Sequence, residues 1–154
     1  MPDMDRRAVV RSATWAVPVV AVAAAAPAFA ASGSNLSTST IGPIVTAGSG
    51  SNRFTNVTVT ITNSGTSPTT ALRATIALES DVRAQDQVAP VGWTVSYDPA
   101  TQTLTYTSAT QLAAGATRAV VFTIRPGNNS ALGAVVALDP GGGGLGRTFP
   151  RVIL

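Results

Sequence analysis

The side chains that most often perform acid–base, nucleophilic or zinc chemistry are absent from this chain. It has no histidine and no cysteine, and all of its basic residues are arginines. A serine nucleophile therefore lacks its usual imidazole base, a lysine-assisted mechanism lacks its lysine, and the usual zinc ligands are missing. The composition favours a protein that is not an enzyme and that carries no cofactor.

Carboxylates are the remaining candidates for catalysis or metal binding. Glu79, Asp81 and Asp86 fall within one polar segment, and clustered oxygen ligands are what calcium binds. Their spacing lacks the ordered acidic positions and the fixed glycine of a calcium loop, so a solvated loop is the favoured interpretation. Asp98 and Asp139 each precede a proline, which is typical of turns. We expect no metal site.

Three aromatic side chains suggest a different kind of site. Trp93, Tyr97 and Tyr106 fall on an expected hairpin whose turn begins at an Asp-Pro pair. Exposed in a row, the three rings would form a platform for a sugar. The other interpretation is that they share an inward face with Val95 and Leu104 and belong to the core, where buried aromatic rings contribute strongly. The sequence favours the core, and the exposure of the rings decides between the two.

The sequence gives little support for phosphate binding or for nucleic-acid binding. Gly141–Gly146 lacks the Lys-Ser/Thr pair of a phosphate-binding loop and precedes no expected helix, so it is expected to be a flexible connector. The formal net charge is +3. Beyond the N-terminal segment the arginines stand singly, rather than in a basic patch interleaved with aromatic residues. We expect no nucleic-acid partner.

The N-terminus has the composition of an export signal. Arg6 and Arg7 precede a long apolar stretch rich in alanine. Ala28 and Ala30 match the A-x-A-like pattern that a signal peptidase accepts, which predicts a signal peptide over residues 1–30 with cleavage after Ala30. Cleavage after Ala31 is the near alternative. The adjacent arginines are typical of twin-arginine signals. The alternative is that they only supply the positive charge that any export signal needs.

The apolar part of this signal, Ala13–Phe29, is expected to be helical. It is interrupted by Pro18 and Pro27 and is weakly apolar for a membrane span, which needs about 20 strongly apolar residues. Cleavage is therefore favoured over a retained anchor, and only an uncleaved signal would hold the protein in the membrane. We expect a secreted protein, either free outside the cell or associated with the cell wall.

The rest of the chain has the alternating pattern of short β-strands. In "VTVTIT", residues 57–62, the aliphatic side chains share one face and the threonines share the other, which is typical of a half-buried strand. Residues 31–52 are expected to contain a flexible leader, Ser32–Thr40, and a first strand at Ile41–Thr46. Further strands are expected at Leu72–Leu78, 93–97, 103–107, Arg118–Arg125, Leu132–Leu138 and within 147–154.

Two of these later strands have special features. Leu132–Leu138 is apolar without clean alternation, so it is expected to be buried on both faces. The last strand contains Pro150, which predicts a sheet edge or a bulge. At an edge, unpaired backbone groups can recruit a partner strand. About seven or eight short strands without a helix predict an all-β fold, an antiparallel immunoglobulin-like β-sandwich with Greek-key connections, over residues 53–154.

Two corners of the chain carry a family resemblance. Asn63-Ser64-Gly65 ends one strand, "GWTVSYDPATQTLTYTS" follows as a strand–turn–strand, and Leu112-Ala113-Ala114-Gly115 precedes a strand with valine and phenylalanine. Over residues 54–125 this pattern resembles the immunoglobulin-like repeat modules of bacterial envelope proteins. The signal, with its two arginines, "WAVP" and an alanine run, is similar to those of small secreted actinobacterial proteins. The chain departs from these relatives in having one module and no sorting motif.

The resemblance implies an extracellular part with a structural or adhesive role. We therefore expect a secreted, non-catalytic module of the cell envelope, whose partner is a cell-wall polymer or another envelope protein. The alternative is a glycan- or wall-polymer-binding module that uses Trp93, Tyr97 and Tyr106 at its surface.

Overall fold

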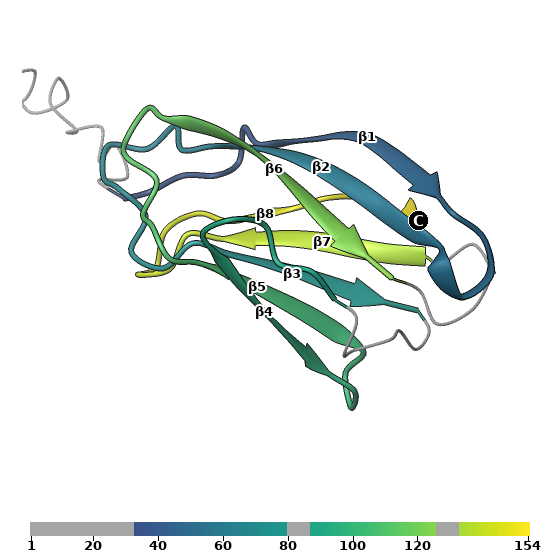
Figure 1. Ribbon diagram of the computed structural model, residues 1–154. Helices are drawn as coiled ribbons and strands as arrows, with labels where there is room; N and C mark the ends of the chain where they lie inside the picture. The colour runs from purple at the N-terminus through teal and green to yellow at the C-terminus, as the bar shows by residue number, and fades with distance from the viewer. Residues whose placement is uncertain (1–32, 80–86, 126–132) are drawn as a thin grey trace, which may run out of the picture. The chain divides into compact units, whose positions relative to one another are not determined.

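The computed structural model describes residues 33–79, 87–125 and 133–154 (Figure 1). The chain divides into two units, residues 1–30 and 31–154, and every described residue belongs to the second. The described part is all-β, and its strands pair antiparallel. In chain order its elements are β1 Thr40–Ala47, the 3-10 turn η1 Gly50–Asn52, β2 Phe54–Thr62, β3 Arg73–Leu78, β4 Trp93–Asp98, β5 Thr103–Ser108, β6 Thr117–Ile124, β7 Gly133–Asp139, β8 Arg147–Thr148 and β9 Val152–Ile153.

The strands form two sheets. The smaller sheet has the order β1-β2-β6, and the larger has the order β4-β5-β3-β7-β8, with β9 also paired to β7. The chain passes from the smaller sheet to the larger after β2, returns for β6, and crosses again to β7, as Figure 1 shows. Side chains from the two sheets meet: the ring of Trp93 on β4 lies edge-on to that of Phe122 on β6, with centroids 5.5 Å apart.

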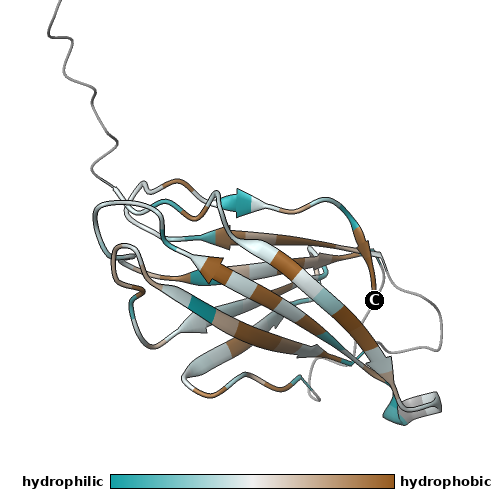
Figure 2. Ribbon diagram, turned by 90° about the horizontal axis from the view of Figure 1, so that it is seen from above, coloured by the Kyte–Doolittle hydropathy of each residue, from teal (hydrophilic) through white to brown (hydrophobic). Residues whose placement is uncertain are grey.

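The core lies between the sheets and follows from the alternation of the strands. On β2, Val57, Val59 and Ile61 are completely buried, and the threonines between them are half-buried on the other face. Figure 2 shows this alternation as bands of hydrophobic and hydrophilic residues along the strands. On β3, Ala74 and Ile76 are equally buried. Because successive side chains of a strand point to opposite faces, a period of two in the sequence becomes one buried face per strand.

The strand expected to be buried on both faces is instead buried on one. β7 points Ala134, Val136 and Leu138 into the core, whereas Val135 is 38% exposed and Ala137 is half-buried. The expectation was wrong because small and β-branched apolar residues also occupy the outer face of this strand, which conceals the alternation.

The flexible leader is a further correction. From Gly33 onward the segment before β1 is tied to the fold, and Leu36 within it is fully buried in the core. Leu36 N–H donates to Leu145 C=O (2.7 Å), and Leu145 N–H donates to Ser34 C=O (2.9 Å). The serine-rich composition that suggested flexibility provides polar groups that bond to neighbouring segments. Ser39 is one of them, since its hydroxyl accepts from Thr62 N–H (3.0 Å).

The end of the chain agrees with the expected edge strand. Pro150 separates β8 from β9, and both two-residue strands pair with β7 at the side of the larger sheet. Within the described ranges no helix is long and apolar enough to cross a membrane.

Candidate functional site

The three aromatic residues that were candidates for a sugar platform do not form a row at the surface. Tyr106 is completely buried, Trp93 is 8% exposed, and Tyr97 is half-buried. The rings of Tyr106 and Trp93 both pack on Phe122, with the Tyr106 and Phe122 centroids 4.7 Å apart. The Tyr106 hydroxyl donates to Thr123 C=O on the opposite sheet (3.3 Å). Two of the three rings therefore join the sheets internally, as the core interpretation predicted.

The carboxylates are placed by ion pairing and by turns. Glu79, just after β3, makes a two-point ion pair with Arg151, and the second contact, from Arg151 Nη2 to Glu79 Oε2, measures 2.6 Å. Both side chains are about half-exposed. The hydrogen bond from Arg151 lowers the pKa of Glu79. Asp81 and Asp86, the other members of the suggested calcium cluster, lie outside the described residues. The described part contains no group of three acidic residues that could hold a metal ion.

Asp98 and Asp139 have the turn roles that the sequence predicted. Asp98 accepts from Ala100 N–H and from the Thr101 hydroxyl, both at 2.9 Å. These hydrogen bonds, led by the one from Thr101, lower the pKa of Asp98. Asp139 accepts from the N–H of the second residue after it (2.8 Å). Both carboxylates therefore stabilise the chain reversals in which they lie.

The glycine run is not the free connector expected from its composition. Gly141, Gly142 and Gly143 all have positive φ angles, of 71°, 60° and 77°. This succession of left-handed residues curls the chain into a loop that glycine adopts with little strain. The loop docks on its neighbours, because Thr70 N–H donates to Pro140 C=O (3.0 Å) and Leu145 pairs with the leader. A Cβ at Gly141 or Gly142 would come within 3.0 Å of the Thr70 hydroxyl, so these two glycines permit close packing of the loop.

A buried amide forms the densest polar contact of the described part. Asn63 follows β2 and is completely buried. Its side-chain oxygen accepts from Asn35 N–H (3.0 Å) and Gly65 N–H (3.1 Å). Its side-chain nitrogen donates to Ser67 C=O (2.8 Å) and is shared between the carbonyls of Leu112 (3.1 Å) and Ala113 (3.2 Å). One side chain thus bonds to backbone groups of three separate segments. We call Asn63 with these hydrogen bonds the Asn63 clamp.

The clamp brings together the two corners that carried the family resemblance. Asn63 N–H donates to Ala116 C=O (3.0 Å), and Gly115 N–H donates to Asn63 C=O (2.8 Å). Thr69 adds a second buried link, since its hydroxyl accepts from Leu112 N–H (2.8 Å). The sequence identified each corner separately but gave no signal that they touch, because they are about fifty residues apart.

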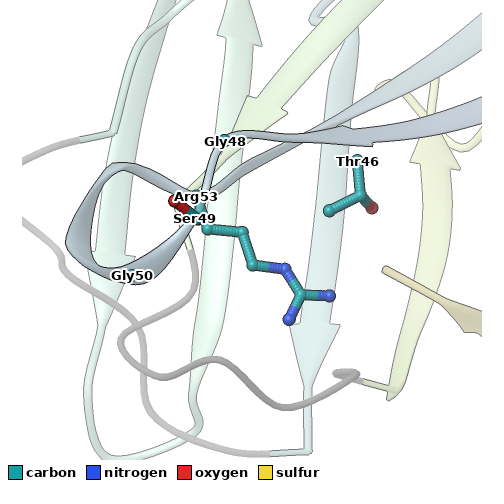
Figure 3. A pocket seen from close by; sticks show the side chains of 5 residues that line it. All are labelled: Thr46, Gly48, Ser49, Gly50 and Arg53. Carbon is teal, nitrogen blue, oxygen red and sulfur yellow. The ribbon is translucent and has the colours of Figure 1, made fainter.

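One surface hollow was not anticipated. It lies at the β1–β2 connection, holds about 340 Å³, and is wide open to solvent. Figure 3 shows the Arg53 side chain extended along it, with Thr46 on its other side and the loop of Gly48, Ser49 and Gly50 at its end. The polar side chains of its lining are Arg53, Ser49 and Thr46, and the Thr46 hydroxyl is already hydrogen-bonded to that of Thr55 (3.0 Å). The pattern "GSGSNR" carried no usable signal, because a single arginine after a loop is common.

The residues of the expected signal, Arg6, Arg7, Ala28 and Ala30, lie outside the described residues. Comparison with known proteins adds no family: no protein-family model matches the sequence. No curated protein matches it either.

Proposed function

We propose that this chain is a secreted, immunoglobulin-like β-sandwich module with a non-catalytic, structural or adhesive role at the bacterial cell envelope. The strand order is the observation that carries the proposal. An immunoglobulin-like sandwich has strands A, B, E and D in one sheet and C, F and G in the other. The smaller sheet of the described part has three strands, and D has no counterpart in it. Here β1, β2 and β6 have the places of A, B and E, and β3, β7 and the pair β8–β9 have those of C, F and G. The hairpin β4–β5 extends the second sheet beyond β3.

The use of polar side chains supports a structural role. Asn63 and Thr69 are buried and bonded to backbone groups of neighbouring segments. Glu79 pairs with Arg151. Each of these groups holds segments of the fold together, and the sequence lacks histidine, lysine and cysteine as partners for catalysis.

The expected export signal supports the proposed location. A positively charged start, an apolar stretch and Ala28-x-Ala30 favour release of a domain that begins at Ala31. The partner is then a cell-wall polymer or another envelope protein. A row of exposed rings for glycan binding is not part of this proposal, because Trp93 and Tyr106 are core residues.

Cell fractionation with intact-mass measurement tests the location. We expect the protein in the culture medium or wall fraction, with the mass of residues 31–154. A pull-down with residues 31–154 should retain wall polymer or an envelope protein. Recovery only from the cytoplasm would contradict the proposal. Substrate turnover that disappears in a Glu79→Gln variant would contradict its non-catalytic part.

A further inference from the structure

The two sheets end in four edges, and three of them carry features that oppose the addition of another strand. Edge strands present unpaired backbone groups, which proteins protect with prolines, bulges, charges, short strands or covering segments. β1 contains Pro43 and a register shift between Ile41 and Ile44. On the far side of the larger sheet, β8 and β9 are two residues long and are separated by Pro150.

The third protected edge is β6. Val88, in the segment before β4, forms a bridge with Thr123 and so covers one end of this strand. Arg118, at the other end, places a charge there, and its side chain crosses to the larger sheet. Its guanidinium donates to the Thr110 hydroxyl (2.9 Å) and the Ser108 hydroxyl (3.3 Å).

Among the described residues, none of these devices occurs on the fourth edge, β4, from Thr94 to Ser96. At the start of the strand, Trp93 N–H is already used, since it donates to Pro90 C=O (3.0 Å). Figure 1 shows β4 as the outermost strand of its sheet. Its register with β5 is unbroken from Trp93 to Asp98. The outward side chains Thr94 and Ser96 are exposed and uncharged, and the first charge occurs only at Asp98, the last residue of the strand.

The hydrogen-bond pattern shows which backbone groups point away from β5. Ala109 N–H donates to Gly92 C=O (2.8 Å), so residue 92 faces β5. Backbone direction alternates along an antiparallel strand, so residues 94 and 96 also face β5, and Val95 faces the open edge. No described residue bonds to the Val95 backbone on that side. A strand of suitable length would find a donor and an acceptor there.

We propose that the β4 edge pairs with β4 of a second copy of this chain, antiparallel and centred on Val95. The two Val95 residues would exchange N–H···O=C hydrogen bonds across a twofold axis. The larger sheets of both copies would then continue as one sheet. The shared groups are backbone hydrogen bonds and a few side chains, so we expect a weak, concentration-dependent dimer.

A second copy is favoured because the strand is complementary to itself in this register. Val95, a half-buried apolar side chain, meets its own counterpart. Thr94 lies opposite Ser96 of the second copy, a hydroxyl pair on the outer face. Asp98 falls opposite Gly92 of the second copy, so the twofold brings no like charges together.

Two double variants of the full chain test this register at the same positions. In Thr94→Lys with Ser96→Lys, like charges face each other across the twofold, which should weaken self-association by about tenfold or more. In Thr94→Glu with Ser96→Lys, opposite charges face each other, and the dimer should persist. Sedimentation velocity over a range of protein concentrations measures both. A parent chain that stays monomeric throughout, or equal association of the two variants, overturns the proposal.

Amide hydrogen exchange by NMR locates the contact independently. Raising the protein concentration should slow exchange at Val95 N–H, for which the described residues of the monomer provide no acceptor. Ser96 N–H faces β5 in every state and should not change. A dimer that leaves Val95 exchange unaltered uses another surface and also overturns the proposal, and so does a monomer whose Val95 is protected only by an added foreign peptide.

Discussion

At the scale of single residues, the structure uses its few polar side chains as internal links. The Asn63 clamp connects the segment before β1, the corner after β2 and the corner before β6 through one amide. A buried amide of this kind stabilises the fold only while all of its hydrogen bonds are made. Its removal leaves several backbone groups buried without a hydrogen-bond partner. The aromatic residues act similarly, because Tyr106 combines a buried ring with a hydrogen bond to the opposite sheet.

Replacing the clamp residue should therefore be costly. We expect Asn63→Ala to lower the free energy of unfolding by about 2–4 kcal/mol, because Asn35 N–H, Gly65 N–H and the facing carbonyls lose their partner. Urea denaturation measures the change. The matched control is Asn56→Ala, which removes a half-exposed amide that accepts from the Thr123 hydroxyl (2.8 Å). Equal losses in the two variants would show that burial of Asn63 is unimportant.

Tyr106 should make stability depend on pH in the alkaline range. Burial raises the pKa of its phenol above the ordinary value of 10.0. The folded state thus holds this proton more tightly than the unfolded chain, so the contribution is complete below about pH 10 and is lost as the pH rises further. The chain has no lysine and only one other tyrosine, which simplifies the alkaline titration.

The measurement compares the parent with Tyr106→Phe in urea at several pH values between 8 and about 11.5, a range that brackets the ordinary phenol pKa. The variant should lose about 0.5–1.5 kcal/mol near neutral pH, from the hydrogen bond to Thr123. Above pH 10 its stability should fall less steeply than that of the parent. Parallel pH profiles would rule out Tyr106 as the titrating group.

At the scale of elements, the segment before β1 behaves as part of the sandwich. Leu36 fills the core, and Asn35 and Leu145 pair as a short parallel bridge between this segment and the glycine loop. Gly65 permits the approach, since a Cβ there would clash with backbone atoms of Gly33 and Asn35. The strands, in contrast, could be predicted from the sequence, because the alternation of apolar and polar residues is a local pattern.

Leu36→Ala tests the position of this segment. The side chain is fully buried, so its truncation should cost about 2–5 kcal/mol of unfolding free energy. Leu145→Ala is the control, since Leu145 belongs to the same bridge but its side chain is 58% exposed. We expect a loss below about 0.5 kcal/mol there. A similarly small loss for Leu36→Ala would indicate that this segment is a flexible leader and not part of the core.

At the scale of the whole molecule, stability must come from packing and hydrogen bonds. The chain has no cysteine, although disulfides commonly stabilise small exported domains. After removal of residues 1–30, a chain of this length can bury roughly two thirds of its unfolded surface, which suffices for a core. Without cysteine, folding of this chain involves no disulfide formation. The domain is therefore compatible with export after folding, the property of the twin-arginine route that the N-terminal sequence suggests.

The export route can be tested at this scale. Replacing both Arg6 and Arg7 with lysine keeps the positive charge but removes the arginine pair. We expect this variant to accumulate inside the cell, because the twin-arginine route requires the arginine pair. The general secretory route requires only the positive charge, which the lysines keep. Immunoblotting of cell and medium fractions measures the distribution. Undiminished export would assign the signal to the general secretory route.

The sequence by itself determined the features that depend on near neighbours in the chain. The alternation in β2, β3 and β5, the turn at Asp98 and the break at Pro150 were all predicted, because strand faces and turns follow from residues a few positions apart. The alternation also favoured Trp93 and Tyr106 as core residues. The sequence did not reveal the outer face of β7, whose residues are too apolar to mark it.

Only the tertiary structure decided which distant segments meet. Glu79 and Arg151 are 72 positions apart, and Asn63 and Ala113 are 50 apart. No period or motif in one sequence encodes such pairs, because they arise from the pairing of distant strands within a sheet and from the closure of two sheets over a common core. In the folded protein, the segment before β1, which the sequence suggested was a flexible leader, is packed against the core. Gly141–Gly146, which the sequence suggested was a flexible connector, is a loop docked on its neighbours. Within the described ranges, the tertiary structure also left β4 as an edge strand that carries no proline, bulge or charge from Thr94 to Ser96.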